Sequence, residues 1–527
     1  MGQKNLASHV STKTTPQSEP VHGKVQVENN AGGYVFKLDP WKQLDRFLIL
    51  GSEGGTYYVS EKELTQENAA VVRACLALDP KGTVEMIRDV SVSGRAPKNE
   101  PAILALAIAA KTPASRFDAY RVMHEVCRIG THLFHFAEYV KALGGWGRST
   151  RDAFARWYTN RSLDSLALQV VKYQRRDGWS HRDVLCKAHP FTEDKARNGI
   201  FEYVVKGAAP ESPHPLIGAV EEAKALTKKE SLPRLIELVT AHGLPHECVP
   251  NEQKKHPELW EAMLPSMGLT AVVRNLAKMT NVGLLKPLGK ANGAVLAKLA
   301  DVDAMKRQRV HPMALLIALK QYEKGHGDKG KLSWVPVPAI VDALNDAFYA
   351  AFDAVIPSGK ATLVGVDVSG SMAAPISGSS TLSCCDAATA MAMLAIRTEP
   401  NSMAARFNTG MQPLTFTKKT RLDDALEQTR FINVGGTDCS LPMLWALEQK
   451  IPAEVFWVVT DNETWAGKIH PFQALRQYRE KTGINAKLVV MGMASTGFTI
   501  ADPSDAGMMD VVGFDAAVPP VVADFAR

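Results

Sequence analysis

Cysteine is scarce in this chain, and no two cysteines have the spacing of a metal-binding or redox pair. The 527 residues include seven cysteines, and no two of them are spaced as Cys-x-x-Cys. Disulfides accumulate in oxidising compartments, whereas an odd number of scattered thiols is typical of a reducing one. We therefore expect a cytoplasmic protein without a disulfide framework.

Signals for membrane insertion and secretion are also missing. No apolar run approaches the roughly 20 residues that a membrane-spanning helix needs. The N-terminal stretch MGQKNLASHVSTKTTPQSEP is polar, whereas a secretory signal would have an apolar core at this place. We expect no membrane partner, and we interpret residues 1–24 as a flexible N-terminal tail.

The sequence lacks the common motifs of nucleotide- and metal-dependent enzymes. It has no GxxxxGKS/T phosphate loop, no HExxH zinc motif and no paired carboxylates with the spacing of a two-metal site. We therefore expect no catalytic residues and favour a protein that binds nucleic acid. Two alternatives stay open, namely a metal-dependent RNA enzyme and an adhesion-type protein whose metal ion captures a carboxylate of a partner.

Positive charge is unevenly spread along the chain. The net charge is +6, but residues 361–527 contain 13 Lys and Arg against 17 Asp and Glu, so the first 360 residues carry a net charge of +10. Within them, residues 141–197 hold 12 basic and 6 acidic side chains. A basic part beside an acidic part indicates a nucleic-acid partner for the basic part.

Two patterns of apolar residues divide the chain. From about Asp45 to Ala350 they recur at intervals of three and four, as in SLDSLALQVVKYQ, which indicates consecutive helices. After Lys360, continuous apolar runs such as ATLVGVD and EVFWVVT alternate with helical segments, which is typical of a doubly wound parallel sheet. We predict a multidomain protein with an all-helical domain over residues 25–360 and a Rossmann-like α/β domain over residues 361–527.

Polar residues follow the predicted strands of the α/β half. Asp367, Ser369 and Ser371 come at the end of one strand, Asp461 follows another, and Thr437 lies in a Gly-Gly-Thr loop between them. Ligands of doubly wound sheets bind beyond the carboxyl ends of the strands. Hydroxyl and carboxylate oxygens suit one Mg²⁺ ion, with Mn²⁺ or Ca²⁺ as other candidates. These five residues are our predicted metal site, and a hydrogen-bonded loop cluster is the alternative.

The segment from Leu163 to Arg176 is predicted to form one helix in the basic region. Its apolar residues share one face, and Lys172 and Arg176 lie one turn apart on the opposite, polar face. Such a face suits contact with phosphates. A solvated helix face without a ligand is the plainer interpretation.

A second helix is predicted after Ser180, whose hydroxyl fits a capping box with Asp183. The helix should end before the proline at position 190, which leaves His189 at its C-terminal edge. We interpret Trp146 and Trp179 as packing residues.

Several longer stretches resemble the Ro autoantigen (TROVE-module) family, in a bacterial-type form. The resemblance covers residues from about 27 to 525. The main stretches are NNAGGYVF (29–36), RFLILGSEGGTYY (46–58), KYQRRDGWSHRDVL (172–185), YEKGHGDKGKLSW (322–334), TDNETWAG (460–467) and GFTIADPSDAGMMDVVGFD (497–515).

This resemblance implies a fold and a function. The helical module would be a closed ring of HEAT-like repeats, whose hole admits single-stranded 3′ ends of misfolded noncoding RNA and whose basic outer surface binds Y RNA or Y-like RNA. The protein would be a non-enzymatic monomer acting in RNA quality control, processing or stress response. The family also implies a possible partner, an exoribonuclease such as polynucleotide phosphorylase, tethered by the RNA.

The α/β half resembles von Willebrand factor A domains with a metal-ion-dependent adhesion site. The resemblance implies that Ser369, Ser371 and Thr437 ligate the metal directly, whereas Asp367 and Asp461 act through water.

The same resemblance assigns roles in the helical half. Lys172, Arg176 and His189 match positions that contribute to RNA binding in the family, and all three keep their residue types. It does not assign the residues that would line the hole.

Overall fold

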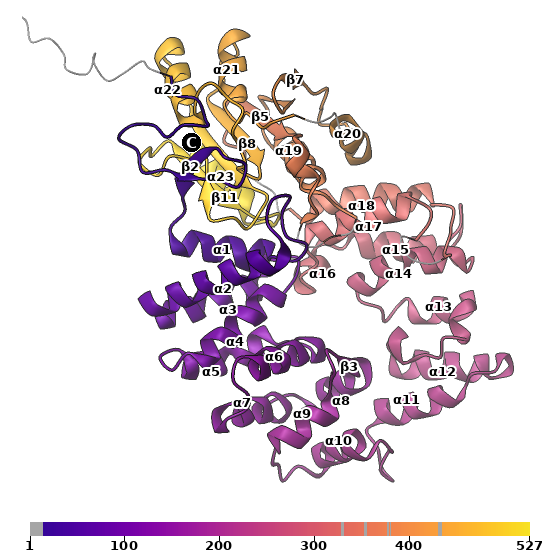
Figure 1. Ribbon diagram of the computed structural model, residues 1–527. Helices are drawn as coiled ribbons and strands as arrows, with labels where there is room; N and C mark the ends of the chain where they lie inside the picture. Colours follow the sequence, from indigo (N-terminus) through magenta and orange to yellow (C-terminus); the bar gives the residue numbers. More distant parts are fainter. Residues whose placement is uncertain (1–13, 328–330, 353–355, 377–378, 380, 431–434) are drawn as a thin grey trace, which may run out of the picture. The chain divides into compact units, whose positions relative to one another are not determined.

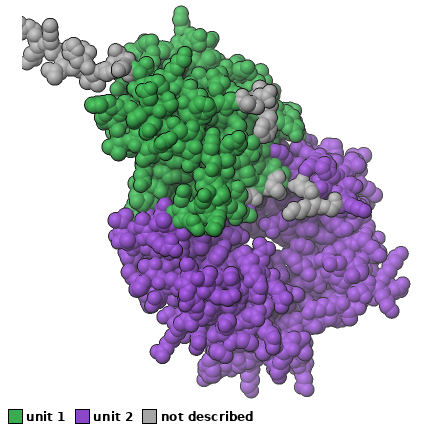
Figure 2. Space-filling model, viewed as in Figure 1, with its two compact units in different colours: residues 1–68, 354–527 green, residues 69–353 purple. Residues whose placement is uncertain are grey.

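The computed structural model describes residues 14–327, 331–352, 356–376, 379, 381–430 and 435–527. The chain forms two compact units, one of residues 1–68 with 354–527 and one of residues 69–353 (Figure 2). We call them the α/β unit and the helical unit. This division differs from the predicted domains of 25–360 and 361–527, because the first 68 residues join the α/β unit.

The helical unit consists of consecutive helices, as the periodicity of its apolar residues predicted (Figure 1). Its helices are α2 (Glu61–Leu78, which starts ahead of the unit), α3 (Pro80–Ser93), α4 (Glu100–Lys111), α5 (Arg116–Val126), α6 (Gly130–Ala142), α7 (Arg148–Thr159), α8 (Leu163–Lys172), α9 (His181–Ala188), α10 (Lys195–Lys206), α11 (Pro215–Ala225), α12 (Leu232–His242), α13 (Pro257–Met263), α14 (Leu269–Asn281), α15 (Asn292–Ala300), α16 (Val302–Arg307), α17 (Pro312–Glu323) and α18 (Pro338–Ala350). A short hairpin, β3 (Arg175–Arg176) and β4 (Trp179–Ser180), separates α8 from α9.

Helices two apart in the chain pack side by side in the first half of this unit. Helix α3 packs against α5, α5 against α7 and α7 against α9, while α4 packs against α6. Stacked helical repeats pack in this way, because each repeat buries its apolar face against the next repeat.

An early and a late part of the helical unit are in contact. The Nε2 atom of His311, just before α17, lies 3.1 Å from the carbonyl oxygen of Arg95, just after α3. Beside this contact, a Cβ placed on Gly94 would lie 3.5 Å from Cβ of Arg309. The Nδ1 atom of His311 accepts a hydrogen bond from the Met313 amide at 3.1 Å, which orients the ring. The array of helices therefore closes on itself, as a ring requires.

The α/β unit is built on a six-stranded sheet with strand order β11-β9-β8-β5-β6-β7. All neighbours are parallel except β6 and β7. The strands are β5 (Thr362–Asp367), β6 (Ser402–Phe407), β7 (Met411–Pro413), β8 (Val455–Thr460), β9 (Lys487–Gly492) and β11 (Met508–Val512), and the helices after β5 are α19 (Cys384–Thr398), α20 (Leu422–Thr429), α21 (Leu441–Glu448), α22 (Pro471–Thr482) and α23 (Val518–Ala526). Every residue of β5 and β8 is buried, so both faces of the sheet are covered, as predicted for a doubly wound fold.

The N-terminal segment forms part of the α/β unit. It contributes β1 (Val27–Glu28), β2 (Tyr34–Lys37) and α1 (Pro40–Leu50), and β2 pairs antiparallel with β10 (Phe498–Thr499). These elements lie far from the sheet in sequence, so only tertiary pairing brings them together.

Part of the predicted flexible tail is packed into this unit. The Gln17 side chain is fully buried, and its amide donates to Oδ1 of Asp438 and to the carbonyl oxygen of Ile469, each at 2.8 Å. Its backbone amide donates to the Gly467 carbonyl at 2.9 Å. The expectation of a flexible tail over residues 1–24 therefore does not hold for residues 14–24, and residues 1–13 lie outside the described part of the chain.

A buried ion pair fastens α1 to the sheet. Arg46 is 1% exposed and pairs with Asp510 of β11, and its guanidinium also donates to the carbonyl oxygens of Phe498 at 2.9 Å and Thr496 at 3.3 Å. A charge removed from water this completely needs such partners, because desolvation otherwise costs several kcal/mol.

Two further expectations concern membranes and disulfides. Among the described residues, no helix is both long enough and apolar enough to cross a membrane. All seven cysteines are free thiols, and five of them are buried, where they pack as small apolar side chains.

Candidate metal centre and nucleic-acid surface

The predicted metal ligands lie at one edge of the parallel sheet. Strand β5 ends at Asp367, and its parallel neighbour β8 ends at Thr460, immediately before Asp461. The carboxyl ends of parallel neighbours meet at the same edge, so the loops that follow them face one site.

Hydrogen bonds arrange the first of these loops. The Thr460 hydroxyl donates to Oδ2 of Asp367 at 2.6 Å, and the Ser369 amide donates to its Oδ1 at 2.9 Å. The hydroxyl oxygens of Ser369 and Ser371 are 3.2 Å apart. Both carboxylate oxygens of Asp367 are therefore engaged by the protein, while the two serine hydroxyls lie side by side.

Two carboxylates are buried together here. Asp367 is 0% and Asp461 is 5% exposed. Burial, reinforced by the nearby charge of Asp461, raises the pKa of Asp367 to about 7. Burial also raises the pKa of Asp461, and a hydrogen bond from the Ser371 hydroxyl opposes that shift.

Among the described residues, no ion pair joins either carboxylate to a lysine or arginine. The site therefore holds two buried carboxylates, and no described basic side chain neutralises them. Together with the adjacent hydroxyl oxygens, they form a set of ligands that fits a hard divalent cation. Among the described residues, no three His, Cys, Asp or Glu side chains lie close enough together to bind a metal ion. The serine hydroxyls are therefore needed to complete the proposed set of ligands.

The centre is closely covered by the N-terminal segment. A cavity of about 20 Å³ is lined by Ser371 and Asp461 from one side and by Thr56 and Tyr57 from the other. That volume corresponds to about one water-sized particle. Burial, followed by the negative charges of Asp461 and Glu463, raises the pKa of Tyr58 to about 12.

Thr437 is buried on the loop next to this site. Its carbonyl oxygen accepts hydrogen bonds from the amides of Trp465 at 3.0 Å and Ala466 at 3.1 Å. A Cβ on Gly436 would lie 2.7 Å from Cβ of Ala466, so the two loops touch. In the part of the chain that is described, no hydrogen bond joins the Thr437 hydroxyl to the other four predicted ligands. The structure thus brings four of the five side chains together and places the fifth on an adjoining loop.

The N-terminal segment also holds the loop after Asp461. Asn29 donates to the Thr464 carbonyl at 2.9 Å, Asn30 donates to Oε1 of Glu463 at 2.7 Å, and the Ala31 amide donates to Oε2 of Glu463 at 3.1 Å. A Cβ on Gly33 would lie 1.8 Å from the Thr464 carbonyl oxygen, so only glycine fits there.

Sequence reasoning missed these contacts. The stretch NNAGGYVF lies within the predicted helical domain of residues 25–360, whereas the structure places it in the α/β unit. Its two asparagines and two glycines indicate a turn with unusual backbone angles. The local sequence does not predict which distant loop this turn contacts.

The predicted helix from Leu163 to Arg176 is shorter than expected. Helix α8 ends at Lys172, and Arg176 lies in the β3–β4 hairpin. The cause is the turn between the strands, where Asp177 and Gly178 adopt φ values of 52° and 78°. Asp-Gly with two positive φ angles is a preferred two-residue hairpin loop. Lys172 and Arg176 are therefore not one helical turn apart, and this correction follows from a local signal that the helical pattern masked.

The candidate RNA-binding side chains are accessible but only loosely paired. Arg176 is 58% exposed and lies 3.6 Å from Asp177, and Lys172 is 26% exposed and lies 3.8 Å from Glu247. His189 is exposed at the end of α9 with a φ of 48°, so the predicted end of that helix is confirmed. These three residues remain a prediction as an RNA site.

The hairpin rests on a rigid base. The predicted capping box of Ser180 and Asp183 is present, and the Trp179 indole donates to Glu138 at 2.8 Å. Trp179 is 5% exposed and stacks on Trp146, with ring centroids 5.6 Å apart. Both tryptophans pack as predicted, which holds the basic hairpin in one conformation.

Two family models match the chain. The TROVE domain matches residues 27–241 and 245–321, and the Ro60 vWA domain matches residues 361–526. The first model therefore includes residues 27–68, which the structure places in the α/β unit.

Relatives are similar along almost the whole chain. RNA-binding protein RO60 of Deinococcus radiodurans is 41% identical over 529 residues, which covers 99% of each protein. RNA-binding protein RO60 of Caenorhabditis elegans is 37% identical over 585 residues, covering 95% of this chain and 90% of that protein. The crystal structure of the D. radiodurans RO (RSR) protein matches with a TM-score of 0.70 and 41% identity, over 93% of this chain and 99% of that one.

Proposed function

The chain belongs to the Ro60 family of proteins with TROVE and vWA domains, and from that premise we propose that it is a non-enzymatic RNA-binding protein. Its relatives in D. radiodurans and C. elegans are named as RNA-binding proteins. Its described part has no helix able to span a membrane, and we assign it to the cytoplasm as part of the proposal.

The observation that carries the proposal is the basic hairpin of the helical unit. Arg175 and Arg176 are exposed on β3, and Lys172 stands four residues before Arg176, with its Nζ 5.5 Å from the Tyr173 ring centroid. Partly exposed ion pairs such as those of Lys172 and Arg176 are weak, so phosphates can replace the carboxylates. Because the hairpin is already held in place, little conformational entropy is lost when RNA binds.

We assign structured noncoding RNA, of the Y RNA or Y-like type, to this surface. Helix α9 connects the hairpin to His189 and spans roughly 12 Å for its 8 residues. A run of basic groups over that length suits several consecutive phosphates of one RNA strand.

We assign single-stranded 3′ ends of misfolded RNA to the interior of the closed helical array. The contact between His311 and Arg95 supports this assignment, because a closed array can enclose an unpaired strand. RNA quality control follows as the proposed role, with an exoribonuclease such as polynucleotide phosphorylase as a partner tethered by the RNA.

The vWA part is proposed to bind one Mg²⁺ ion. Ser369 and Ser371 would supply direct oxygen ligands, Asp367 and Asp461 would act through water, and Thr437 would join from the adjoining loop. The support is the pair of buried, unbalanced carboxylates beside the two serine hydroxyls. The ion would supply positive charge at an edge that is otherwise negative.

The RNA surface is tested with the full-length protein and a small structured RNA. Lys172→Ala/Arg176→Ala should lower affinity and reduce the log–log salt slope by about 1.4–1.8, since each lost phosphate contact removes about 0.7–0.9. The control Lys42→Ala/Lys62→Ala removes two exposed charges of the α/β unit and should leave the slope near its original value. An unchanged slope in the first variant contradicts the surface, and a wild-type protein that binds no RNA at low salt contradicts the function.

Threading is tested with two RNAs of equal length. An RNA with a single-stranded 3′ end should bind more tightly than a blunt duplex at the same salt concentration. Equal affinities would refute entry of a 3′ end into the array.

A further inference from the structure

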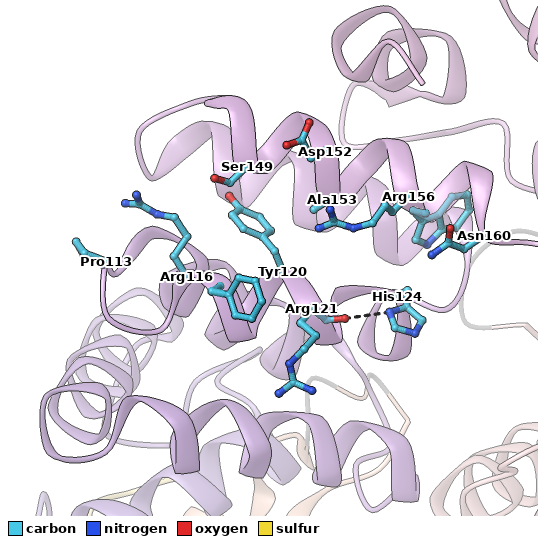
Figure 3. A pocket seen from close by; sticks show the side chains of 12 residues that line it. Pro113, Arg116, Tyr120, Arg121, His124, Ser149, Asp152, Ala153, Arg156 and Asn160 are labelled. Carbon is cyan, nitrogen blue, oxygen red and sulfur yellow. Dashed lines mark hydrogen bonds between the residues drawn. The ribbon is translucent and has the colours of Figure 1, made fainter. Parts of the chain in front are cut away.

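A second cavity lies in the helical unit, outside every site described above. It measures about 670 Å³ and opens between α5 and α7 (Figure 3). Pockets that hold small ligands are commonly about 300–1,000 Å³. Neither Lys172, Arg176 nor His189 lines it. We call this cavity the α5–α7 groove.

Aromatic side chains form part of the groove. Tyr120 and Trp157 are 6% and 1% exposed, whereas Phe117 is 80% exposed. The Tyr120 hydroxyl is bonded to Thr150 at 2.6 Å, and the Trp157 indole donates to the Cys127 carbonyl at 2.6 Å. Tyr120 and Trp157 are therefore fixed in the wall of the groove, and the ring that is accessible to a ligand is that of Phe117.

Positive side chains surround the rings. Arg116, Arg121 and His124 come from α5 and Arg156 comes from α7, all four exposed, and Asp152 is the one acidic residue among the lining residues that the structure describes.

Among the described residues, only one of the three arginines that line the groove forms an ion pair, so positive charge remains for a ligand. Arg121 is paired with Asp118 at 3.1 Å. In the described chain, Arg116 and Arg156 form no ion pair. Figure 3 shows Arg116 and Arg156 on opposite sides of Tyr120, so the two arginines flank the aromatic centre. A ligand in the groove would meet the exposed ring of Phe117 and two cations that form no ion pair with any described residue.

An unpaired nucleotide has the matching chemistry. Its base is a flat ring that stacks on aromatic side chains, and its phosphates pair with arginine. Bases within a duplex are already stacked and paired, so only a single-stranded segment can present them. The exposed Ser149 and Asn160 add hydrogen-bonding groups at the two ends of the α7 side.

We propose that the α5–α7 groove binds unpaired nucleotides of RNA, with a base stacked on Phe117 and phosphates held by Arg116 and Arg156. The proposal rests on RNA binding as the function of the chain, but it concerns different residues from the basic hairpin. It gives the helical unit one surface for the backbone of structured RNA and another for an unpaired segment.

The test uses the full-length protein and a fluorescent single-stranded oligonucleotide of about six nucleotides, within the range that such sites cover. Phe117→Ala should weaken its binding about 5- to 160-fold, the effect of losing one base–aromatic stack. Phe117→Trp should restore affinity, and Val521→Ala, which removes an exposed apolar side chain of the α/β unit, should leave it unchanged. Arg116→Gln/Arg156→Gln should reduce the salt slope by about 1.4, at about 0.7 per single-strand contact.

Photo-crosslinking of a 4-thiouridine oligonucleotide locates the contact. The expected crosslinks fall in residues 116–124 and 149–160. Wild-type affinity in both groove variants, or crosslinks confined to other parts of the chain, would overturn the proposal. A loss with Arg116→Gln/Arg156→Gln but none with Phe117→Ala would also overturn it, because it would show phosphate contact without base stacking. If the wild type binds neither this oligonucleotide nor structured RNA, the proposed function fails too.

Discussion

The two compact units differ in the sign of their net charge and in the kind of ionisable group that they bury. The helical unit has 40 Lys and Arg against 30 Asp and Glu, whereas the α/β unit has 21 against 25. No described Lys or Arg of the helical unit is buried. Burial raises the pKa of Asp367 and lowers the pKa values of His181 and His311. The cause is the same, since burial disfavours the charged form, but it produces unbalanced acids in one unit and neutral histidines in the other.

The comparison teaches how each unit can bind. A dispersed positive surface attracts a long polyanion at many points, whereas two enclosed acids select one compact cation. Four changes test whether the units are stabilised as differently as this contrast implies.

The largest effect is expected from Arg46→Met. It leaves Asp510 buried without its partner, which costs about 3–5 kcal/mol. Hydrogen exchange followed by mass spectrometry should become faster in β9 and β11, with no change in α4 to α9. Lys42→Met removes an exposed charge from the same helix and should have little effect. Equal exchange in the two variants would show that the ion pair does not hold α1 on the sheet.

The second effect concerns Mg²⁺. At about 100 times its dissociation constant, the ion should stabilise the α/β unit by about 2.7 kcal/mol and slow hydrogen exchange at the ends of β5 and β8. Asp367→Ala/Ser369→Ala should abolish this effect, as should Ser371→Ala alone, while Asp424→Ala, an exposed acid on α20, should retain it. Slowed exchange that persists in the double variant would place the ion elsewhere.

The third effect is a loss of stability of the helical unit in acid. Burial lowers the pKa of His181 to about 3 and that of His311 to about 4, below the value of about 6.5 for an unfolded chain. The unfolded state therefore binds protons first. The stabilisation is complete above pH 6.5 and is lost as pH falls towards these folded-state values.

Between pH 6.5 and 5 the loss should be about 1–2 kcal/mol for each histidine. Urea unfolding at both pH values, at matched ionic strength, measures it. In His311→Gln the pH dependence should become shallower, and an unchanged slope would exclude His311 as a source.

The smallest effect is expected at the start of α9. Ser180→Ala removes a capping box next to the basic hairpin and should cost about 1 kcal/mol. Ser231→Ala is the matched control, because Ser231 occupies the same position before α12 without a side-chain capping bond. Similar unfolding midpoints for the two variants would mean that the capping box does not support the hairpin.

Much of the metal centre could be predicted because its signals are short and local. Asp367, Ser369 and Ser371 follow a continuous apolar run, Asp461 follows another, and parallel strands must bring such ends to one edge. The relation of Thr437 to the other four could not be predicted to the same degree. Its loop is positioned by backbone contacts with Trp465 and Ala466, which no periodicity encodes.

The β3–β4 hairpin is the opposite case, because a local turn signal is present but the helical spacing of the neighbouring apolar residues conflicts with it. Asp177-Gly178 favours a tight turn, but the apolar spacing of the preceding residues extended the predicted helix to Arg176. Periodicity describes which face is buried, and it is a poor guide to the residue at which a helix stops.

By itself, the sequence determined the types of element in each half, the excess of positive charge in the helical part and the oxygen ligands at the strand ends. These depend on intervals of two to four residues and on side-chain chemistry, which act locally. Only the tertiary structure decided that residues 14–68 belong to the α/β unit, through Gln17, Asn29 and Arg46, and that His311 meets Arg95. Such contacts join groups hundreds of residues apart, and their partners are selected by shape and by the need to satisfy buried polar atoms, which no local pattern records.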